Sequence, residues 1–197
     1  MNITLVYENP EQQNTTAMLL LDAGFMVTQA FSLRTNWVHT TQQQAPDMLV
    51  IAVTNPHDDV LQQLKIFHQQ PVCPVIVIAY TAEASIARAT ILAGADTCIT
   101  GAVSADRIQS FIEVACIRFE LTQGMQKTIR DLKEQIESLE ARLNDRRDID
   151  RAKGLLMSSY KMSEDDAFNA MRRIAMDTGN KLGDIARNLI SMSNVLN

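Results

Sequence analysis

The sequence predicts an α/β domain with a doubly wound, five-stranded parallel sheet, followed by an all-α C-terminal part. Two observations carry this prediction: short apolar runs alternate with helical segments over residues 1–117, and helical spacing alone continues from residue 118. Such alternation favours a parallel sheet, because each helix returns the chain across one face. The strands are expected at 3–7, 26–31, 48–53, 75–80 and 97–100, and the helices between them include 15–22, 57–69 and 84–93.

The charge of the chain is unevenly distributed. The formal net charge of −5 divides into −6 over residues 1–117, −1 over 118–145 and +2 over 146–197. The C-terminal part is therefore the only net-basic region, which favours contact with a polyanion there.

Several function classes find no support in the composition. The first residues lack a basic region and no apolar stretch approaches the roughly 18 residues of a membrane span, so we expect a cytoplasmic protein without a membrane partner. Cys73, Cys98 and Cys116 have no metal-ligand spacing and are expected to be free thiols, and the three histidines are scattered, so neither a metal nor a cofactor is expected. No nucleophile, base and orienting group come together, which argues against an enzyme.

The first 117 residues resemble a two-component receiver domain. APDMLVIAV at 45–53, GADTCIT at 94–100 and the spacing of the strands carry the resemblance. Receivers hold magnesium with acidic residues after the first strand, take a phosphoryl group on an Asp that ends the third, and place a Lys at the end of the fifth. Those groups neutralise charge on the transferred phosphoryl group and supply the nucleophile.

The residues at the matching positions of this chain lack that chemistry. They are Glu8, Asn9, Ala52 and Gly101. Alanine cannot be phosphorylated, and no lysine stands near the end of the fifth strand. Asp58 and Asp59 are alternative acceptors, but their position favours the start of a helix, where acidic side chains complement the helix dipole. We therefore predict a pseudoreceiver over 1–117 that acts through protein contacts.

Residues 118–147 are predicted to form a coiled-coil dimerisation helix. Apolar residues recur at alternating spacings of four and three, as in a heptad seam, and charged residues flank them. An amphipathic helix packed on its own protein is the alternative. The seam consists of Met125, Ile129, Leu132, Ile136, Leu139 and Leu143.

Residues 148–197 are predicted to form three helices, the first shared with the coiled coil. Ser163 begins the second helix, the break falls at 178–180, and the third runs from 181 to about 191. We expect Phe168 in the core and Gly154 at a close helix approach. RAKGLLM at 151–157, KMSEDDAFNAMRRIAM at 161–176 and NKLGDIARNLI at 180–190 resemble an ANTAR domain, the RNA-binding module of bacterial antiterminators.

The order of the three segments is similar to that of the antiterminators of aliphatic-amidase and nitrate-assimilation operons. The resemblance implies a homodimer that binds leader RNA with paired hairpins, prevents formation of a terminator, and is controlled by a ligand-sensing repressor protein. Basic side chains, and one tyrosine for base stacking, are the candidate RNA contacts. They are Arg151, Lys153, Tyr160, Lys161, Arg172, Arg173, Lys181 and Arg187.

Three alternatives remain open from the residues alone. A phosphorelay regulator with a shifted acceptor would use Asp58 or Asp59. A DNA-binding regulator would read bases with the helix after residue 180, which offers only Lys181, Arg187 and Asn188 as polar readers. A pure interaction scaffold would need only the coiled coil.

Overall fold

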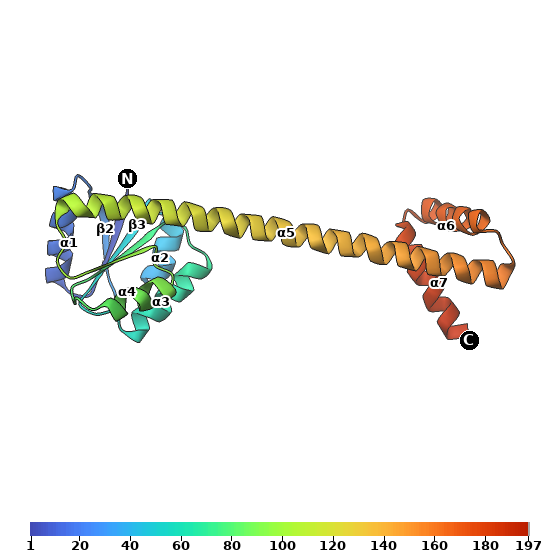
Figure 1. Ribbon diagram of the computed structural model, residues 1–197, viewed down its shortest axis with the longest axis horizontal. Coiled ribbons are helices and arrows are strands. Elements are labelled where there is room, and N and C mark those ends of the chain that lie inside the picture. The colour runs from blue at the N-terminus through green and yellow to red at the C-terminus, as the bar shows by residue number, and fades with distance from the viewer. Residues whose placement is uncertain (197) are drawn as a thin grey trace. The chain divides into compact units, whose positions relative to one another are not determined.

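The chain folds into two compact units, one from Met1 to Met125 and a second that begins at Gln126. The computed structural model describes residues 1–196, with side chains through residue 193. Helix α5, Ala105–Tyr160, passes from one unit into the other without a break (Figure 1). The expected limits at residues 117 and 147 both lie inside this helix, and they stay predictions.

The first unit contains the predicted five-stranded parallel sheet. The strand order is β2-β1-β3-β4-β5, and every neighbouring pair is parallel. Three strands have the expected bounds, β2 is shifted by one residue at both ends, and β4 ends one residue earlier than expected. The strands are β1 Ile3–Tyr7, β2 Val27–Ser32, β3 Met48–Val53, β4 Val75–Ala79 and β5 Thr97–Thr100.

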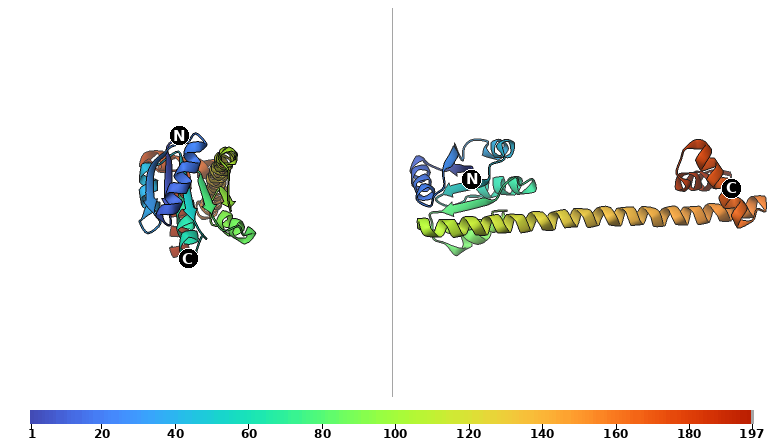
Figure 2. Two further views of the ribbon diagram at one scale, coloured as in Figure 1. Left: turned by 90° about the vertical axis from the view of Figure 1, so that its left-hand side faces the viewer. Right: turned by 90° about the horizontal axis from the view of Figure 1, so that it is seen from above.

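Helices cover both faces of the sheet (Figures 1 and 2). They are α1 Pro10–Asp22, α2 Trp37–Gln44, α3 Asp58–Gln69, α4 Ala84–Leu92 and the first turns of α5. Leu20 of α1 and Ile108 of α5 pack with Val50 and Ile76 on one face. On the other face α2, α3 and α4 pack over the alternate residues of the same strands, including Ile51. Every residue of β3 and β4 is buried, as a doubly covered parallel sheet requires.

Helix α2 was not predicted from the sequence, and its packing explains why. Its residues WVHTTQQQ include few strong helix formers, and Asn36 at its start makes no side-chain capping hydrogen bond. Trp37 is completely buried, and its ring centroid lies 6.1 Å from that of Phe67. Tertiary packing therefore holds this helix.

The second unit ends in two short helices, α6 Glu164–Thr178 and α7 Leu182–Leu196. The Ser163 hydroxyl accepts a hydrogen bond from the Asp166 backbone N–H at 3.1 Å and donates to the Asp166 carboxylate at 2.6 Å. Gly179 closes α6 with φ of 66°, a left-handed conformation that glycine adopts without strain. The predicted start and end of this helix are confirmed.

The three cysteines are free thiols, as expected. Cys73 is buried, and desolvation raises its pKa to about 12. Within residues 1–196, no helix has both the length and the apolar character that crossing a bilayer requires.

Candidate nucleic-acid interface

The C-terminal helices pack around a core built mainly from small residues. Ala152 of α5, Ala167 of α6 and Ala186 of α7 are completely buried, and Met171 fills the space between them. Alanine adds little volume, so the helix axes can approach closely. Their burial gives these alanines a packing role. Gly154 differs from its prediction, because no atom lies within 4 Å of a Cβ built there.

Two of the predicted RNA-contacting cations are engaged in ion pairs within this unit. Lys153 Nζ lies 2.6 Å from Glu164 Oε1 and 2.9 Å from Asp150 Oδ1, and its side chain is only 17% exposed. These partners raise the pKa of Lys153 above its usual range. The Lys153–Glu164 pair joins α5 to the start of α6. Lys153 is therefore better placed to position α6 than to bind a phosphate.

Arg187 forms similar ion pairs, which join α7 to α5. Its guanidinium lies 2.6 Å from Asp145 Oδ1, 2.6 Å from Asp184 Oδ1 and 3.5 Å from Asp148 Oδ2. The Asp145 and Asp184 carboxylates hold the pKa of Arg187 above its usual range. Gly183 is buried beside this cluster, and a Cβ there would clash with the Asp145 carboxylate.

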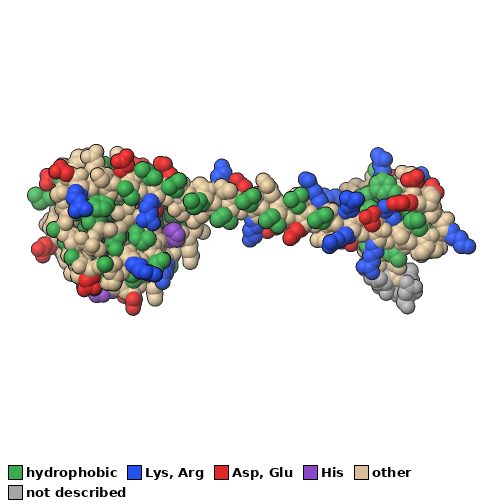
Figure 3. Space-filling view, in the orientation of Figure 1, with side chains coloured by type: hydrophobic (Ala, Val, Ile, Leu, Met, Phe, Trp, Pro, Cys, Tyr) green, Lys and Arg blue, Asp and Glu red, His purple; other side chains and the backbone are tan. Residues whose placement is uncertain are grey.

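The remaining candidate cations stay available to a ligand. Within the side chains that the structure describes, none of them forms an ion pair, and all five are exposed. Lysine and arginine side chains gather over the C-terminal helices in Figure 3, among a smaller number of acidic ones. The five are Arg151, Lys161, Arg172, Arg173 and Lys181.

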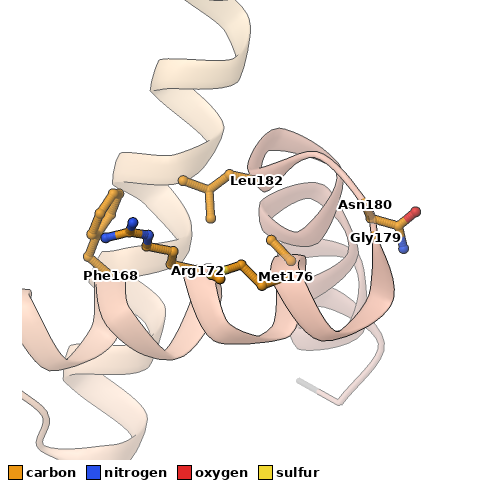
Figure 4. A pocket seen from close by; sticks show the side chains of 7 residues that line it. Phe168, Arg172, Met176, Gly179, Asn180 and Leu182 are labelled. Carbon is orange, nitrogen blue, oxygen red and sulfur yellow. The ribbon is translucent and has the colours of Figure 1, made fainter.

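A shallow hollow lies between α6 and the start of α7 (Figure 4). Its volume is about 540 Å³, and Arg172 is the predicted contact that lines it. Phe168, expected in the core, is 38% exposed and lines the same hollow. The expectation was wrong because helical spacing does not distinguish an apolar residue at the edge of a buried stripe from one at its centre.

Tyr160 occupies a different place. It is 68% exposed at the end of α5 and lines a second hollow of about 250 Å³ with Leu156, Leu189 and Met192. The structure thus separates Tyr160 from the Phe168–Arg172 hollow, and no pattern in the sequence indicates that separation.

The predicted heptad seam forms an exposed apolar row on α5. Its six side chains, Met125 to Leu143, are 52–65% exposed, and a row of apolar side chains follows the helix in Figure 3. Large apolar side chains in one continuous exposed row are uncommon on a monomeric protein and mark an interaction surface.

At the carboxyl edge of the sheet, internal hydrogen bonds occupy the residues at the predicted receiver positions. Glu8 Oε2 accepts from the Thr54 backbone N–H at 2.7 Å and from Gln12 Nε2 at 3.2 Å. Gln12 Nε2 also lies 2.8 Å from Thr54 Oγ1. The Thr54 hydrogen bond is the main cause that lowers the pKa of Glu8. Asn9 is occupied as well, because its side chain caps α1 through the Gln12 N–H.

The other predicted receiver positions offer no reactive group. Ala52 is completely buried in β3, and Gly101 follows β5 with φ of 75°. Asp58 and Asp59 are the first two residues of α3, at the helix start that the sequence predicted. Among the described residues, no three His, Cys, Asp or Glu side chains are grouped so as to hold a metal ion.

Comparison with protein families decides what the C-terminal helices are. The family model of the ANTAR domain matches residues 137–190. These residues form an ANTAR domain. The ANTAR domain includes the last part of the apolar row on α5, both ion-pair clusters and the Phe168–Arg172 hollow.

Two characterised proteins are similar in sequence. The transcriptional regulatory protein PdtaR of Mycobacterium tuberculosis strain H37Rv is 26% identical over 161 residues, which cover 82% of this chain and 75% of PdtaR. The nitrate regulatory protein of Klebsiella oxytoca is 36% identical over 64 residues, which cover 32% of this chain and only 16% of that protein. Both relatives are named as regulators.

Two solved structures share the fold of the first unit. A pilus assembly-related protein of Burkholderia pseudomallei has a TM-score of 0.53 at 17% identity and covers 60% of this chain and 90% of its own. The signal receiver domain of a modulated diguanylate cyclase from Desulfovibrio desulfuricans G20 has a TM-score of 0.51 at 16% identity and covers 61% and 97%. This chain therefore combines a receiver-like domain with an ANTAR domain.

Proposed function

We propose that this protein is an RNA-binding transcription antitermination regulator. In this proposal its ANTAR domain binds leader RNA with paired hairpins and prevents a terminator from forming. The observation that carries the proposal is the match of residues 137–190 to the ANTAR domain, on helices where five candidate cations are exposed and without ion pairs among the described side chains. The similarity to PdtaR and to the nitrate regulatory protein supports a regulatory role.

The apolar row on α5 supports dimer formation. A parallel pair of these helices would bury Ile129, Leu132, Ile136 and Leu139, whose side chains are now more than half exposed. Two ANTAR domains on one dimer would then bind two hairpins of one RNA, and the second binding event would be intramolecular. Paired hairpins therefore suit a dimer better than a monomer.

The receiver-like domain supports control by a partner protein rather than by phosphorylation. Ala52 occupies the acceptor position, and the Glu8 carboxylate already accepts hydrogen bonds from Thr54 and Gln12. In our proposal a ligand-sensing repressor protein masks the regulator until an inducer releases it. Incubation with acetyl phosphate is expected to leave Asp58 and Asp59 unmodified. Labelling of either residue that also switches RNA binding would replace this proposal with a phosphorelay mechanism.

The main test is a gel shift with the leader RNA of the operon beside this chain's gene. Wild type is expected to bind with an affinity that falls linearly on a log–log plot against salt concentration. The double variant Arg172→Ala/Lys181→Ala is expected to bind at least tenfold more weakly and with a shallower salt slope. The matched control Lys65→Ala/Arg88→Ala removes the same charge from the receiver-like domain and is expected to bind as wild type does.

The alternatives predict other results in the same assay. Preference for duplex DNA of the same sequence would favour a DNA-binding regulator. A folded wild-type dimer that binds neither nucleic acid would favour an interaction scaffold.

Sedimentation tests the dimer. Leu139→Asp places a charge in the apolar row and is expected to give a monomer, because a buried carboxylate without a partner is costly. Ser138→Asp adds the same charge beside the row and is expected to remain dimeric. A monomeric wild type would contradict the dimer.

A further inference from the structure

The hollow between α6 and the start of α7 is lined by both apolar and polar side chains. Phe168, Arg172 and Met176 follow one another at intervals of four residues, so they lie along one side of the helix. Leu182, at the start of α7, faces this row (Figure 4). Apart from Arg172 and Asn180, the side chains that line the hollow are apolar.

Arg172 and Phe168 form the end of the hollow nearest the start of α6. Helical side chains point toward the N-terminus of their helix, so the Arg172 side chain extends over the turn that carries Phe168 (Figure 4). The ring of Phe168 is 38% exposed, and Arg172 has no ion pair among the described side chains. A partly exposed aromatic ring therefore lies beside a guanidinium that has no ion pair among the described side chains (Figure 4).

The surroundings favour an anionic polymer over a protein segment. Arg173 adjoins the hollow in sequence and Lys181 precedes Leu182, and both are exposed. Two acidic residues of α6 are engaged elsewhere, because Glu164 pairs with Lys153 and Asp166 bonds with Ser163. The other two, Asp165 and Asp177, are exposed, so the cations around the hollow outnumber the unpaired acidic residues of α6. An RNA loop supplies both phosphates for the cations and unstacked bases for an aromatic face.

We propose that this hollow holds one unstacked base of the RNA loop. The Phe168 ring stacks on the base. The Arg172 guanidinium contacts an edge of the same base or binds the adjoining phosphate. Met176 and Leu182 form the apolar floor of the hollow. Asn180 lies at the far side of the hollow with its amide directed away from Arg172, so it takes no part in reading the base (Figure 4). This inference rests on the proposed RNA-binding function and names the contact that it uses.

The test combines protein variants with abasic RNA. The same leader RNA is synthesised with one loop base at a time removed, and affinities are measured for wild type and Phe168→Ala. Loss of a stacked base typically weakens binding about tenfold. At one loop position we expect about a tenfold loss from the abasic site, about a tenfold loss from Phe168→Ala, and no further loss when both changes are combined.

Two controls separate the base contact from folding and from general weakening. Ile174→Ala removes an apolar side chain that is 42% exposed on the same helix but does not line the hollow, and it is expected to leave affinity within twofold. Met176→Glu places a carboxylate in the hollow at a position that is 73% exposed, where folding is insensitive to it. We expect it to weaken binding at least tenfold, whereas Met18→Glu, at 66% exposure on α1 of the receiver-like domain, does not.

The outcomes distinguish this inference from the proposed function. One outcome is that wild type binds the RNA while Phe168→Ala and an abasic site each reduce affinity independently, so that their fold-losses multiply at every loop position. In that case the base site is wrong and RNA binding stands. The base site is also wrong if Met176→Glu binds as tightly as Met18→Glu. If wild type does not bind the RNA, the proposed function fails and the base site fails with it.

Discussion

The polar groups of the receiver-like domain and of the ANTAR domain are arranged in opposite ways. At the carboxyl edge of the sheet, Glu8, Gln12 and Thr54 bond with one another. On α6, Arg172 and Phe168 face outward into an open hollow. The receiver-like domain therefore shares a fold with receivers without offering free polar groups at this edge. The ANTAR domain, where Arg172 has no ion pair among the described side chains, is the part to test for a ligand.

The hydrophobic cores of the two domains differ as well. A substitution in the core of the receiver-like domain gives the largest expected loss of stability. The sheet is packed with large aliphatic residues, so Ile51→Ala, at a completely buried position, is expected to cost about 2–5 kcal/mol. Trp37 is the only tryptophan and is buried in the same unit, so its fluorescence during urea unfolding reports on this domain. Leu92→Ala, at 73% exposure, is the control and is expected to change stability by less than about 0.5 kcal/mol.

The ANTAR core, which contains several buried alanines, is expected to be destabilised by larger side chains rather than by smaller ones. Ala152→Leu inserts a larger side chain at a completely buried position and should destabilise the helices by about 1–3 kcal/mol. Gly154→Ala, two residues along the same helix, meets open space and should stabilise them by about 1 kcal/mol. Circular dichroism melts measure both. Equal effects of the two variants would show that the core is loosely packed.

The α6 cap should give a smaller effect. Ser163→Ala removes the acceptor for the Asp166 N–H and is expected to cost about 1 kcal/mol. Ser158→Ala is the control, because its hydroxyl donates only to the Leu155 carbonyl within α5. Hydrogen exchange of the first turn of α6 would localise the effect. Unchanged exchange there would show that the Lys153–Glu164 pair holds the turn without the cap.

The Glu8 network should give the smallest effect, and it depends on pH. Because its hydrogen bonds lower the pKa of Glu8, this carboxylate contributes stability above its unfolded pKa of about 4.3, and the contribution is lost as pH falls through the lower folded value. Glu8→Gln is expected to cost about 0.5 kcal/mol at pH 7 and to match wild type in acid. Urea unfolding at several pH values measures the difference, with the exposed Glu11→Gln as control. A pH-independent difference would contradict the network.

The sequence predicted the elements whose pattern is local. The strands alternate with helices in a regular order, and Ser163 and Gly179 mark α6 through capping chemistry. Helix α2 escaped prediction because buried Trp37, and not local propensity, holds it. The start of α5 at Ala105 was missed because the residues before 118 pack on the sheet and show no heptad spacing.

The candidate site was predictable in composition but not in arrangement. The basic residues are visible in the sequence, yet their partners come from other helices: Glu164 for Lys153, and Asp145, 42 residues away, for Arg187. Spacing along one helix cannot reveal such pairs. For the same reason the sequence did not indicate that Phe168 and Leu182 line one hollow, because the turn at Gly179 brings them together.

Helix α5 carries both the apolar row and a part of the ANTAR core. The apolar row ends at Leu143, and only a few residues later Asp145 bonds to α7, while Ala152 and Leu156 enter the ANTAR core. If two copies pair along the row, they fix the helix on which α6 and α7 fold. Dimerisation would then contribute to the folding free energy of the ANTAR domain, and its melting temperature would rise with protein concentration. A repressor that separated the two copies would thereby lower both the valency and the folded fraction of the RNA-binding helices.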